Sequence, residues 1–217
     1  LFGAVTWQAT DKLELRAGAR YTVDEKKLTV EDYWNTGFAA CVLAGKCTLA
    51  QLAALEPDGD LSASPEDKKF NWDLSATYAV NDDINLYGNW GIGFKSGGFN
   101  NQGSAAIVDS AFNDFIGTNV LIDDQYRKEV SSAFEAGVKG DLLDGAVTFD
   151  LAGYYTKVED MQFFEFFVGS FGLLRVVSNI DEVEVYGAEL NLTVEPVKGW
   201  TIFGSANVTE SEIKANA

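Results

Sequence analysis

The stretch from residue 70 to residue 94, FNWDLSATYAVNDDINLYGNWGIGF, alternates apolar and polar side chains on both sides of a short acidic turn. Successive side chains of a β-strand point to opposite faces, so this period of two predicts two strands, each with an apolar and a polar face. The turn Asn81-Asp82-Asp83 between them has the residue types that favour chain reversal. The stretch therefore predicts an antiparallel hairpin.

The same pattern recurs three more times along the chain. Further hairpins are predicted at residues 1–23 around a turn at 10–12, at 130–158 around 142–145, and at 185–209 around 195–199. This makes about eight antiparallel strands in four hairpins. We expect an all-β chain whose residues 1–217 form one part of a β-barrel domain.

The connections between strands alternate in length. Short turns close the hairpins, whereas long segments at residues 31–68, 97–127 and 160–181 join one hairpin to the next. This alternation is typical of transmembrane β-barrels of the outer membrane. Hydrophobic residues make up 47% of the chain at a mean hydropathy of -0.05, and no apolar run is long enough for a membrane-spanning helix. An interfacial aromatic girdle is expected from Trp7, Trp72, Tyr78 and Trp200.

The charged residues of the strands fall on the polar rows. A charge on the lipid face costs roughly 2–4 kcal/mol at mid-bilayer, so these rows are expected to face a wet lumen. The predicted lumen-lining residues are Arg16, Arg20, Asp73, Lys95, Glu135, Lys139, Asp150 and Glu189. The predicted lipid-facing residues are Leu13, Leu15, Trp72, Leu74, Leu86, Trp90, Phe149, Leu151, Leu190, Leu192 and Ile202. We expect an open, curved sheet whose first and last strands pair with protein outside this sequence.

The charge balance and the lack of histidine exclude several classes of function. A net charge of -17 argues against nucleic-acid binding, because phosphate contacts need clustered Lys and Arg. With no histidine, neither a Ser-His-Asp nor a Cys-His arrangement is possible within the chain. We expect no enzyme activity, no metal site and no cofactor. The acidity is expected in solvated loops, and an acidic vestibule for cationic ligands is the alternative.

The two cysteines, Cys41 and Cys47, lie six positions apart in the first long segment. Outer loops face an oxidising space, so a disulfide between them is predicted. Two free thiols are the alternative.

A phenylalanine-rich segment, MQFFEFFVGSFGLL at residues 161–174, lies between two predicted strands. It is either a loop hairpin that packs its own core or an apolar wall at the mouth of a barrel, where a ligand could rest. The ligand-facing candidates are Phe99, Phe112, Phe115, Tyr126, Phe163, Phe164, Phe166, Phe167, Phe171 and Arg175.

Three stretches resemble the TonB-dependent receptor family. Residues 87–100, YGNWGIGFKSGGFN, resemble a strand and loop start of these receptors. Residues 126–162 resemble the family's next hairpin, and residues 178–214 resemble the hairpin after it, with an Asn at its start and Gly-Ala-Glu-Leu in its middle. The matching residues of the second stretch are Glu135, Gly137, Lys139, Asp144, Gly145, Tyr155, Asp160 and Gln162. Together these stretches cover most of residues 70–214.

The resemblance implies about eight strands of a barrel of about 22 strands, with the plug domain and TonB box elsewhere. It also implies active import of a scarce nutrient across the outer membrane, most commonly a ferric siderophore, energised by the TonB complex acting on the plug. The implied partners are outer-membrane lipid, the TonB complex and the nutrient. One alternative is a complete small eight-stranded outer-membrane barrel with a structural or adhesive role. The other is a soluble β-barrel binding protein.

Overall fold

The computed structural model describes residues 1–30, 61–63, 66–100, 108, 113, 117, 122–169 and 172–214. Eight long strands form one antiparallel sheet in the order β1-β2-β5-β6-β9-β10-β11-β12. Their bounds are β1 Phe2–Thr10, β2 Leu13–Glu25, β5 Glu66–Ala79, β6 Ile84–Lys95, β9 Glu129–Leu142, β10 Val147–Gly169, β11 Gly172–Val197 and β12 Trp200–Lys214. Within the described chain, no helix is long and apolar enough to cross a membrane.

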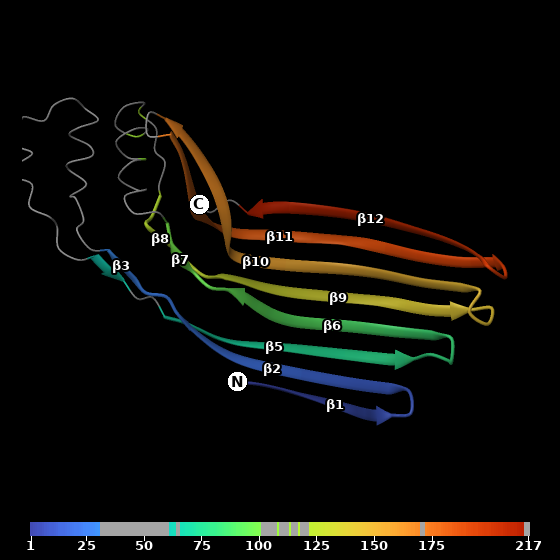
Figure 1. Ribbon diagram of the computed structural model, residues 1–217. Coiled ribbons are helices and arrows are strands. Elements are labelled where there is room, and N and C mark those ends of the chain that lie inside the picture. The colour runs from blue at the N-terminus through green and yellow to red at the C-terminus, as the bar shows by residue number, and fades with distance from the viewer. Residues whose placement is uncertain are drawn as a thin grey trace, which may run out of the picture.

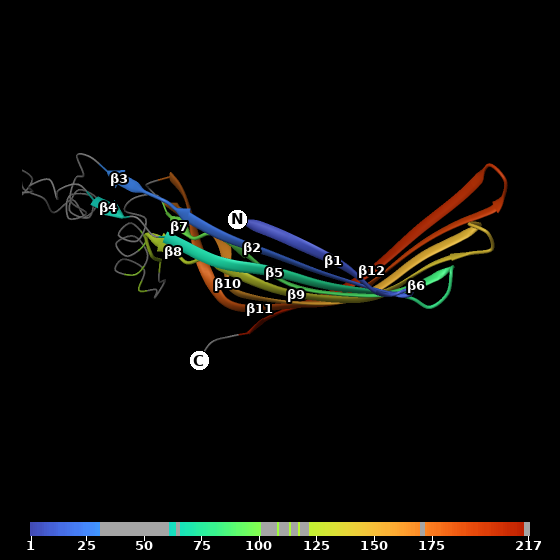
Figure 2. The same cartoon turned by 90° about the horizontal axis from the view of Figure 1, so that it is seen from below.

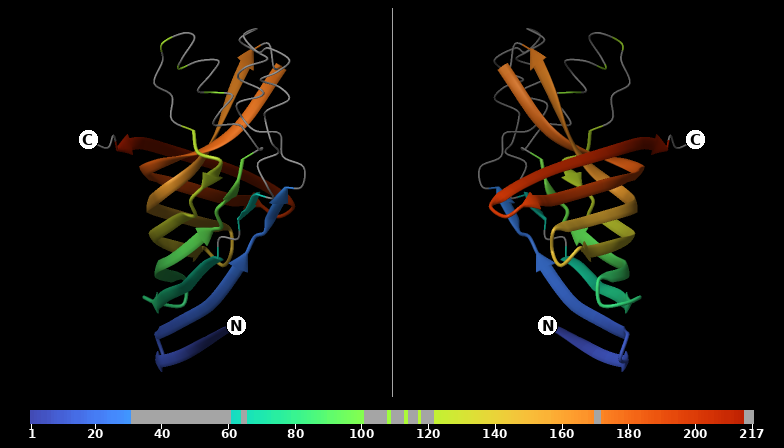
Figure 3. Two further views of the ribbon diagram at one scale, coloured as in Figure 1. Left: turned by 90° about the vertical axis from the view of Figure 1, so that its left-hand side faces the viewer. Right: turned by 90° about the vertical axis from the view of Figure 1, so that its right-hand side faces the viewer.

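The sheet is a curved wall that does not close on itself. The strands β1 and β12 lie at its two edges and do not pair with each other (Figure 3). The all-β, partial-barrel prediction is therefore confirmed. A complete eight-stranded barrel would need the missing pairing between β1 and β12, so this alternative is not favoured.

Short turns close the four hairpins at one end of the wall (Figures 1 and 2). Their polar residues satisfy the turn backbone: Asn81 Oδ1, for example, accepts hydrogen bonds from the main-chain nitrogens of Asp83 and Ile84 at 3.0 and 2.8 Å. The β9–β10 turn has positive φ at Leu143, Asp144 and Gly145. Such angles twist a tight hairpin to match its strands.

Two small ribbons lie at the other end of the wall. They are β3 (Leu28–Val30) with β4 (Leu61–Ala63), and β7 (Gly98–Phe99) with β8 (Gln125–Tyr126). The predicted disulfide between Cys41 and Cys47 lies outside the described residues, so it stays a prediction.

The predicted long connection at residues 160–181 is wrong, because the strands continue through it. β10 and β11 remain paired in register from Val147 and Val194 to Gly169 and Gly172. Asp160 has a left-handed backbone with φ of 53°, and beyond this region the hairpin turns sharply away from the other strands (Figure 1). The Phe-rich segment is therefore the end of a long bent hairpin.

Candidate functional site

One face of the wall carries all eight residues predicted to line the lumen. Residues paired across an antiparallel sheet point to the same side, and the register links Arg16, Ser75, Asn89, Glu135 and Tyr154 in one row. This row contains two of the predicted residues, Arg16 and Glu135. The other six fall on this same face, which we call the polar face: Arg20, Asp73, Lys95, Lys139, Asp150 and Glu189.

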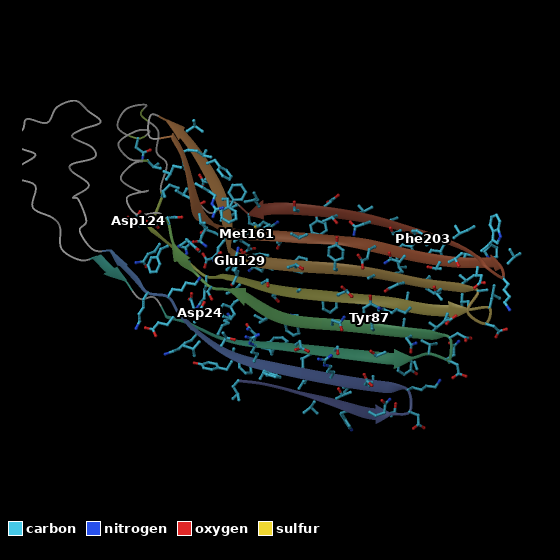
Figure 4. The ribbon with its side chains drawn as sticks, viewed as in Figure 1. Asp24, Tyr87, Asp124, Glu129, Met161 and Phe203 are labelled. Carbon is cyan, nitrogen blue, oxygen red and sulfur yellow. The ribbon has the colours of Figure 1, made fainter. Side chains whose placement is uncertain are left out.

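Side chains on the polar face reach across intervening strands where a glycine leaves room. The Tyr87 ring crosses Gly137 of β9, and its hydroxyl donates to Asp150 Oδ1 of β10 at 3.3 Å. Lys139 Nζ lies 3.1 Å from Asp150 Oδ2 and 4.9 Å from the Tyr87 ring centre. Tyr87 lies midway along the wall (Figure 4).

A second tyrosine repeats this arrangement one pair of strands further on. Tyr154 of β10 lies over Gly187 of β11 and hydrogen-bonds Thr209 of β12. The glycines of the sheet interior therefore allow a network of polar contacts that joins alternate strands.

The opposite face, which we call the apolar face, carries all eleven residues predicted to meet lipid. A row of large aromatic side chains crosses four neighbouring strands on it, formed by Trp90, Phe134, Tyr155 and Tyr186. Trp72 packs edge-on against Trp90 with ring centres 4.8 Å apart. Most of these large side chains are exposed in this chain, Trp90 and Phe134 by 48% and 50%.

The apolar face ends in charged residues at different heights on β2 and β12. The aromatic row continues through Ala17 of β2 at one side and Glu210 of β12 at the other. On β2 the apolar residues run six positions beyond Ala17, to Val23, whereas on β12 they stop two positions short of Glu210, at Val208. The apolar boundary is therefore inclined to the hydrogen-bonded rows.

Beyond this boundary, β10, β11 and β12 carry a ladder of ion pairs. Lys157 lies 3.0 Å from Glu182, and Lys214 lies 3.1 Å from Glu184. Hydrogen bonds to Glu182 and then to Glu159 raise the pKa of Lys157. The Tyr155 hydroxyl and then the Lys214 ammonium hold the pKa of Glu184 below its usual value. Lys157 and Glu184 therefore stay charged across the neutral range.

The end of the β10–β11 hairpin has two unlike faces. On one, Phe167 packs against the buried side chains of Leu174 and Val176, which Val108 and Ile122 of the preceding connection cover. On the other, Phe164, Phe166, Val168 and Leu173 are 45%, 61%, 73% and 69% exposed. Both readings of the Phe-rich segment thus have a counterpart: one face packs a core, and the other is open.

Arg175 lies on the open face. Its guanidinium carbon is 4.7 Å from the centre of the Phe164 ring. A cation over an aromatic face is attracted by the ring's quadrupole, and this contact keeps the positive charge beside the exposed rings. We call Phe164, Phe166, Val168, Leu173 and Arg175 the aromatic face of the hairpin.

The remaining ligand-facing candidates are scattered. Phe99 and Tyr126 are half-buried in the β7–β8 ribbon, where the Tyr126 ring lies against Gly98. Phe163 is 48% exposed. Phe112, Phe115 and Phe171 lie outside the described residues.

Sequence reasoning gave no role to a group of three side-chain amides beside the bend, two of them buried. Asn100 and Gln162 are each only 8% exposed, and together with Asn179 they hydrogen-bond main-chain groups far away in sequence. The sequence does contain a signal that could have pointed to these amides. Asn100 and Gln162 lie in the first two stretches that resemble the TonB-dependent receptor family, and Asn179 is the asparagine at the start of the third.

The family model for the TonB dependent receptor-like β-barrel matches residues 1–216. The chain belongs to this family. The pesticin receptors of Yersinia enterocolitica and Yersinia pestis are each 25% identical to it over 211 residues. The alignment spans 97% of this chain and 25% of each receptor, so the chain corresponds to about a quarter of the length of these relatives.

Solved TonB-dependent receptors have the same fold in this part of their barrels. The ferric yersiniabactin uptake receptor FyuA from Yersinia pestis superposes with a TM-score of 0.64 at 21% identity, over 98% of this chain and 26% of that one. The copper transporter OprC gives 0.65 at 16% identity, over 98% and 29%. The siderophore receptor PiuA from Acinetobacter baumannii gives 0.61 at 17%, over 99% and 25%.

These comparisons show in which membrane the sheet lies. TonB-dependent receptors are bacterial outer-membrane proteins with a general role in transport and are not enzymes. The eight-stranded sheet is thus a section of an outer-membrane barrel.

Proposed function

We propose that the receptor containing this wall actively imports a ferric siderophore across the outer membrane, driven by the TonB complex acting on a plug domain. The family match supports TonB-dependent transport. Relatives of this fold include a ferric yersiniabactin uptake receptor and a siderophore receptor, which supports iron uptake as the specific role.

In this proposal the polar face lines the lumen and the apolar face meets lipid. The inclined apolar boundary is the observation that carries this assignment. Between β2 and β12, which are six strand-to-strand steps apart, the boundary shifts by about eight residues along the strands. With about 3.3 Å per residue along a strand and about 4.8 Å between strands, the boundary is inclined by about 40° to the hydrogen-bonded rows. Strands of outer-membrane barrels tilt by about 35–45°. A bilayer surface would therefore run along this boundary.

We further propose that the aromatic face of the hairpin contacts the siderophore. Exposed aromatic rings can stack on planar aromatic groups, and Arg175 supplies a positive charge beside them. An iron chelate with catecholate or phenolate rings and a net negative charge has matching chemistry. We therefore expect aromatic chelates to bind better than hydroxamate chelates.

The experiment uses the complete receptor in a Gram-negative strain that lacks its own ferric-siderophore receptors. Catecholate, phenolate and hydroxamate siderophores are supplied singly as iron complexes, and radioactive iron uptake is measured with and without TonB. We expect TonB-dependent uptake of at least one aromatic chelate. R175A should reduce this uptake, whereas K198A, which removes a cation at the turn end of the wall, should not.

Two outcomes would count against the proposal. If none of the ferric siderophores is taken up by cells that display folded receptor, siderophore import is wrong. If uptake is equal in R175A and K198A, the transporter assignment stands but the hairpin face is not the contact surface.

A further inference from the structure

Two asparagines make reciprocal contacts between the long hairpin and the base of the preceding connection, residues 96–100 and 122–129. Asn100 Nδ2 donates to the carbonyl oxygen of Val177 at 2.8 Å, and Asn100 Oδ1 accepts from the Val177 nitrogen at 2.7 Å. In the other direction, Asn179 Nδ2 donates to the Arg127 carbonyl at 3.1 Å, and its Oδ1 accepts from the Arg127 nitrogen at 2.7 Å. Each side-chain amide therefore pairs with both the main-chain N–H and the main-chain carbonyl of one residue, as a residue on a neighbouring strand would.

Asn100 binds the main chain of β11 past the described part of β12. Within the described residues, the pairing of β12 with β11 runs as far as Lys214 and Glu182, and Val177 lies five positions further along β11. Main-chain donors and acceptors need partners when they are buried. Asn100, itself 8% exposed, supplies them there and also donates to the Asp123 carbonyl at 2.7 Å.

Gln162 adds a third connection at the bend. Its Nε2 donates to the carbonyls of Ser96 and Arg127 at 2.9 and 3.1 Å, and its main-chain nitrogen donates to Glu129 Oε2 at 2.8 Å. The Arg127 guanidinium lies 2.7 Å from Asp160, the residue with the left-handed backbone. Figure 4 shows Glu129 and Met161 close to the point where the hairpin leaves the wall.

The base of the connection is also attached to the wall on its other side. The Gly97 nitrogen donates to Asp67 Oδ2 of β5 at 2.9 Å, and Lys128 lies 3.6 Å from the same carboxylate. The three amides therefore join the hairpin to a segment that is itself held by the barrel. They act together with the apolar contact of Leu174 and Val176 with Val108 and Ile122, and a two-stranded ribbon beyond a bend needs such attachments to fix its direction.

We propose that Asn100, Gln162 and Asn179 form an amide clamp that fixes the direction of the β10–β11 hairpin and so presents its aromatic face to the ligand as a rigid surface. The three are positioning residues and do not touch the ligand. The clamp's effect on ligand binding rests on the function proposed above, whereas its effect on the hairpin does not. A surface held in its binding conformation loses less conformational entropy when the ligand arrives.

The test compares N100A and N179A in the complete folded receptor with N81A. Asn81 also accepts two main-chain hydrogen bonds, but at the turn end of the wall. Hydrogen exchange is followed by mass spectrometry in peptides from residues 163–168 and 173–178, with residues 84–94 as the barrel reference. Because each clamp substitution removes at least two main-chain partners, exchange at the hairpin should rise by about tenfold or more. It should stay unchanged in N81A and in the barrel peptides.

Binding is measured on the same proteins with whichever ferric siderophore the wild-type receptor takes up. N100A and N179A should weaken it by about fivefold or more at an unchanged barrel melting temperature, and N81A should not. Wild-type exchange at the hairpin in both clamp variants would overturn the proposal, as would faster exchange with unaltered affinity. If the wild-type receptor binds no ferric siderophore, the proposed function fails, and the exchange result alone then decides whether the clamp holds the hairpin.

Discussion

Gly137 is the position where the structure makes the sharpest energetic prediction. An added Cβ there would lie 2.6 Å from the Leu151 carbonyl oxygen of β10 and 2.7 Å from two carbons of the Tyr87 ring. Ordinary contacts begin near 3.4 Å, so G137A must move the ring and also part β9 from β10. The ring alone cannot relieve the strain, because one of the clashing atoms is main chain.

The expected cost follows from three contributions. Overpacking of this kind costs about 1–3 kcal/mol. Displacing Tyr87 also loses its hydrogen bond to Asp150, worth about 1 kcal/mol. Replacing glycine by alanine lowers the conformational entropy of the unfolded chain, which stabilises the folded state by about 0.5–1 kcal/mol. We therefore expect G137A to lower the free energy of unfolding by about 1–3 kcal/mol.

The matched control is G153A on the neighbouring strand. Gly153 lies on the apolar face, and its Cβ would meet only the Gly187 carbonyl oxygen, at 3.9 Å. This variant should be as stable as wild type or slightly more stable. Stability of the complete receptor in lipid vesicles is measured by urea titration of tryptophan fluorescence. Equal midpoints for G137A and G153A would refute the packing of Tyr87 over Gly137.

Two further predictions concern the faces of the wall and its ion pairs. L190R should lower the free energy of unfolding in vesicles by about 2–4 kcal/mol while N191R on the next residue changes it little, because an arginine is costly only on the lipid face; equal costs would contradict the assignment of the faces. The lowered pKa of Glu184 means that its ionised form stabilises the fold above its usual pKa and that this contribution disappears as the pH falls through the lowered value. E184Q should therefore be slightly less stable than wild type at neutral pH, and the two should become equally stable once the pH is below the lowered pKa of Glu184. A difference that persists after this carboxylate is fully protonated would show that its charge is not the cause.

Much of the wall follows from the sequence alone. The strict alternation in residues 70–94 fixes which side chains face lipid and which face water. A shift of one residue in the strand pairing would move every side chain to the opposite face of the sheet. The register then brings Arg16 and Glu135, which are far apart in the chain, into one row of the polar face. The acidic turn at residues 81–83 and the Asp-Gly turn at residues 144–145 were recognisable because their residue types suit tight reversals.

The Phe-rich hairpin was ambiguous because both of its faces are apolar. In FFEFF a period of two gives no preference between Phe166 and Phe167. What separates them is the covering of one face by Val108 and Ile122 from a distant connection. The same abundance of apolar residues hides the strand itself, which is why the sequence predicts a loop at residues 160–181 where the structure has two paired strands.

The amide clamp depended entirely on tertiary structure. Asn100 and Val177 are 77 residues apart, and Asn179 and Arg127 are 52 apart. Alternation assigns a side chain to a face, but it does not say which main-chain groups a bend leaves unpaired or which amide will reach them. The sequence by itself therefore determined most of the strands, their faces and their family, because these depend on local geometry and on the contrast between lipid and water. The direction of the hairpin and the pairing of its amides were decided by contacts between segments that only the folded chain brings together.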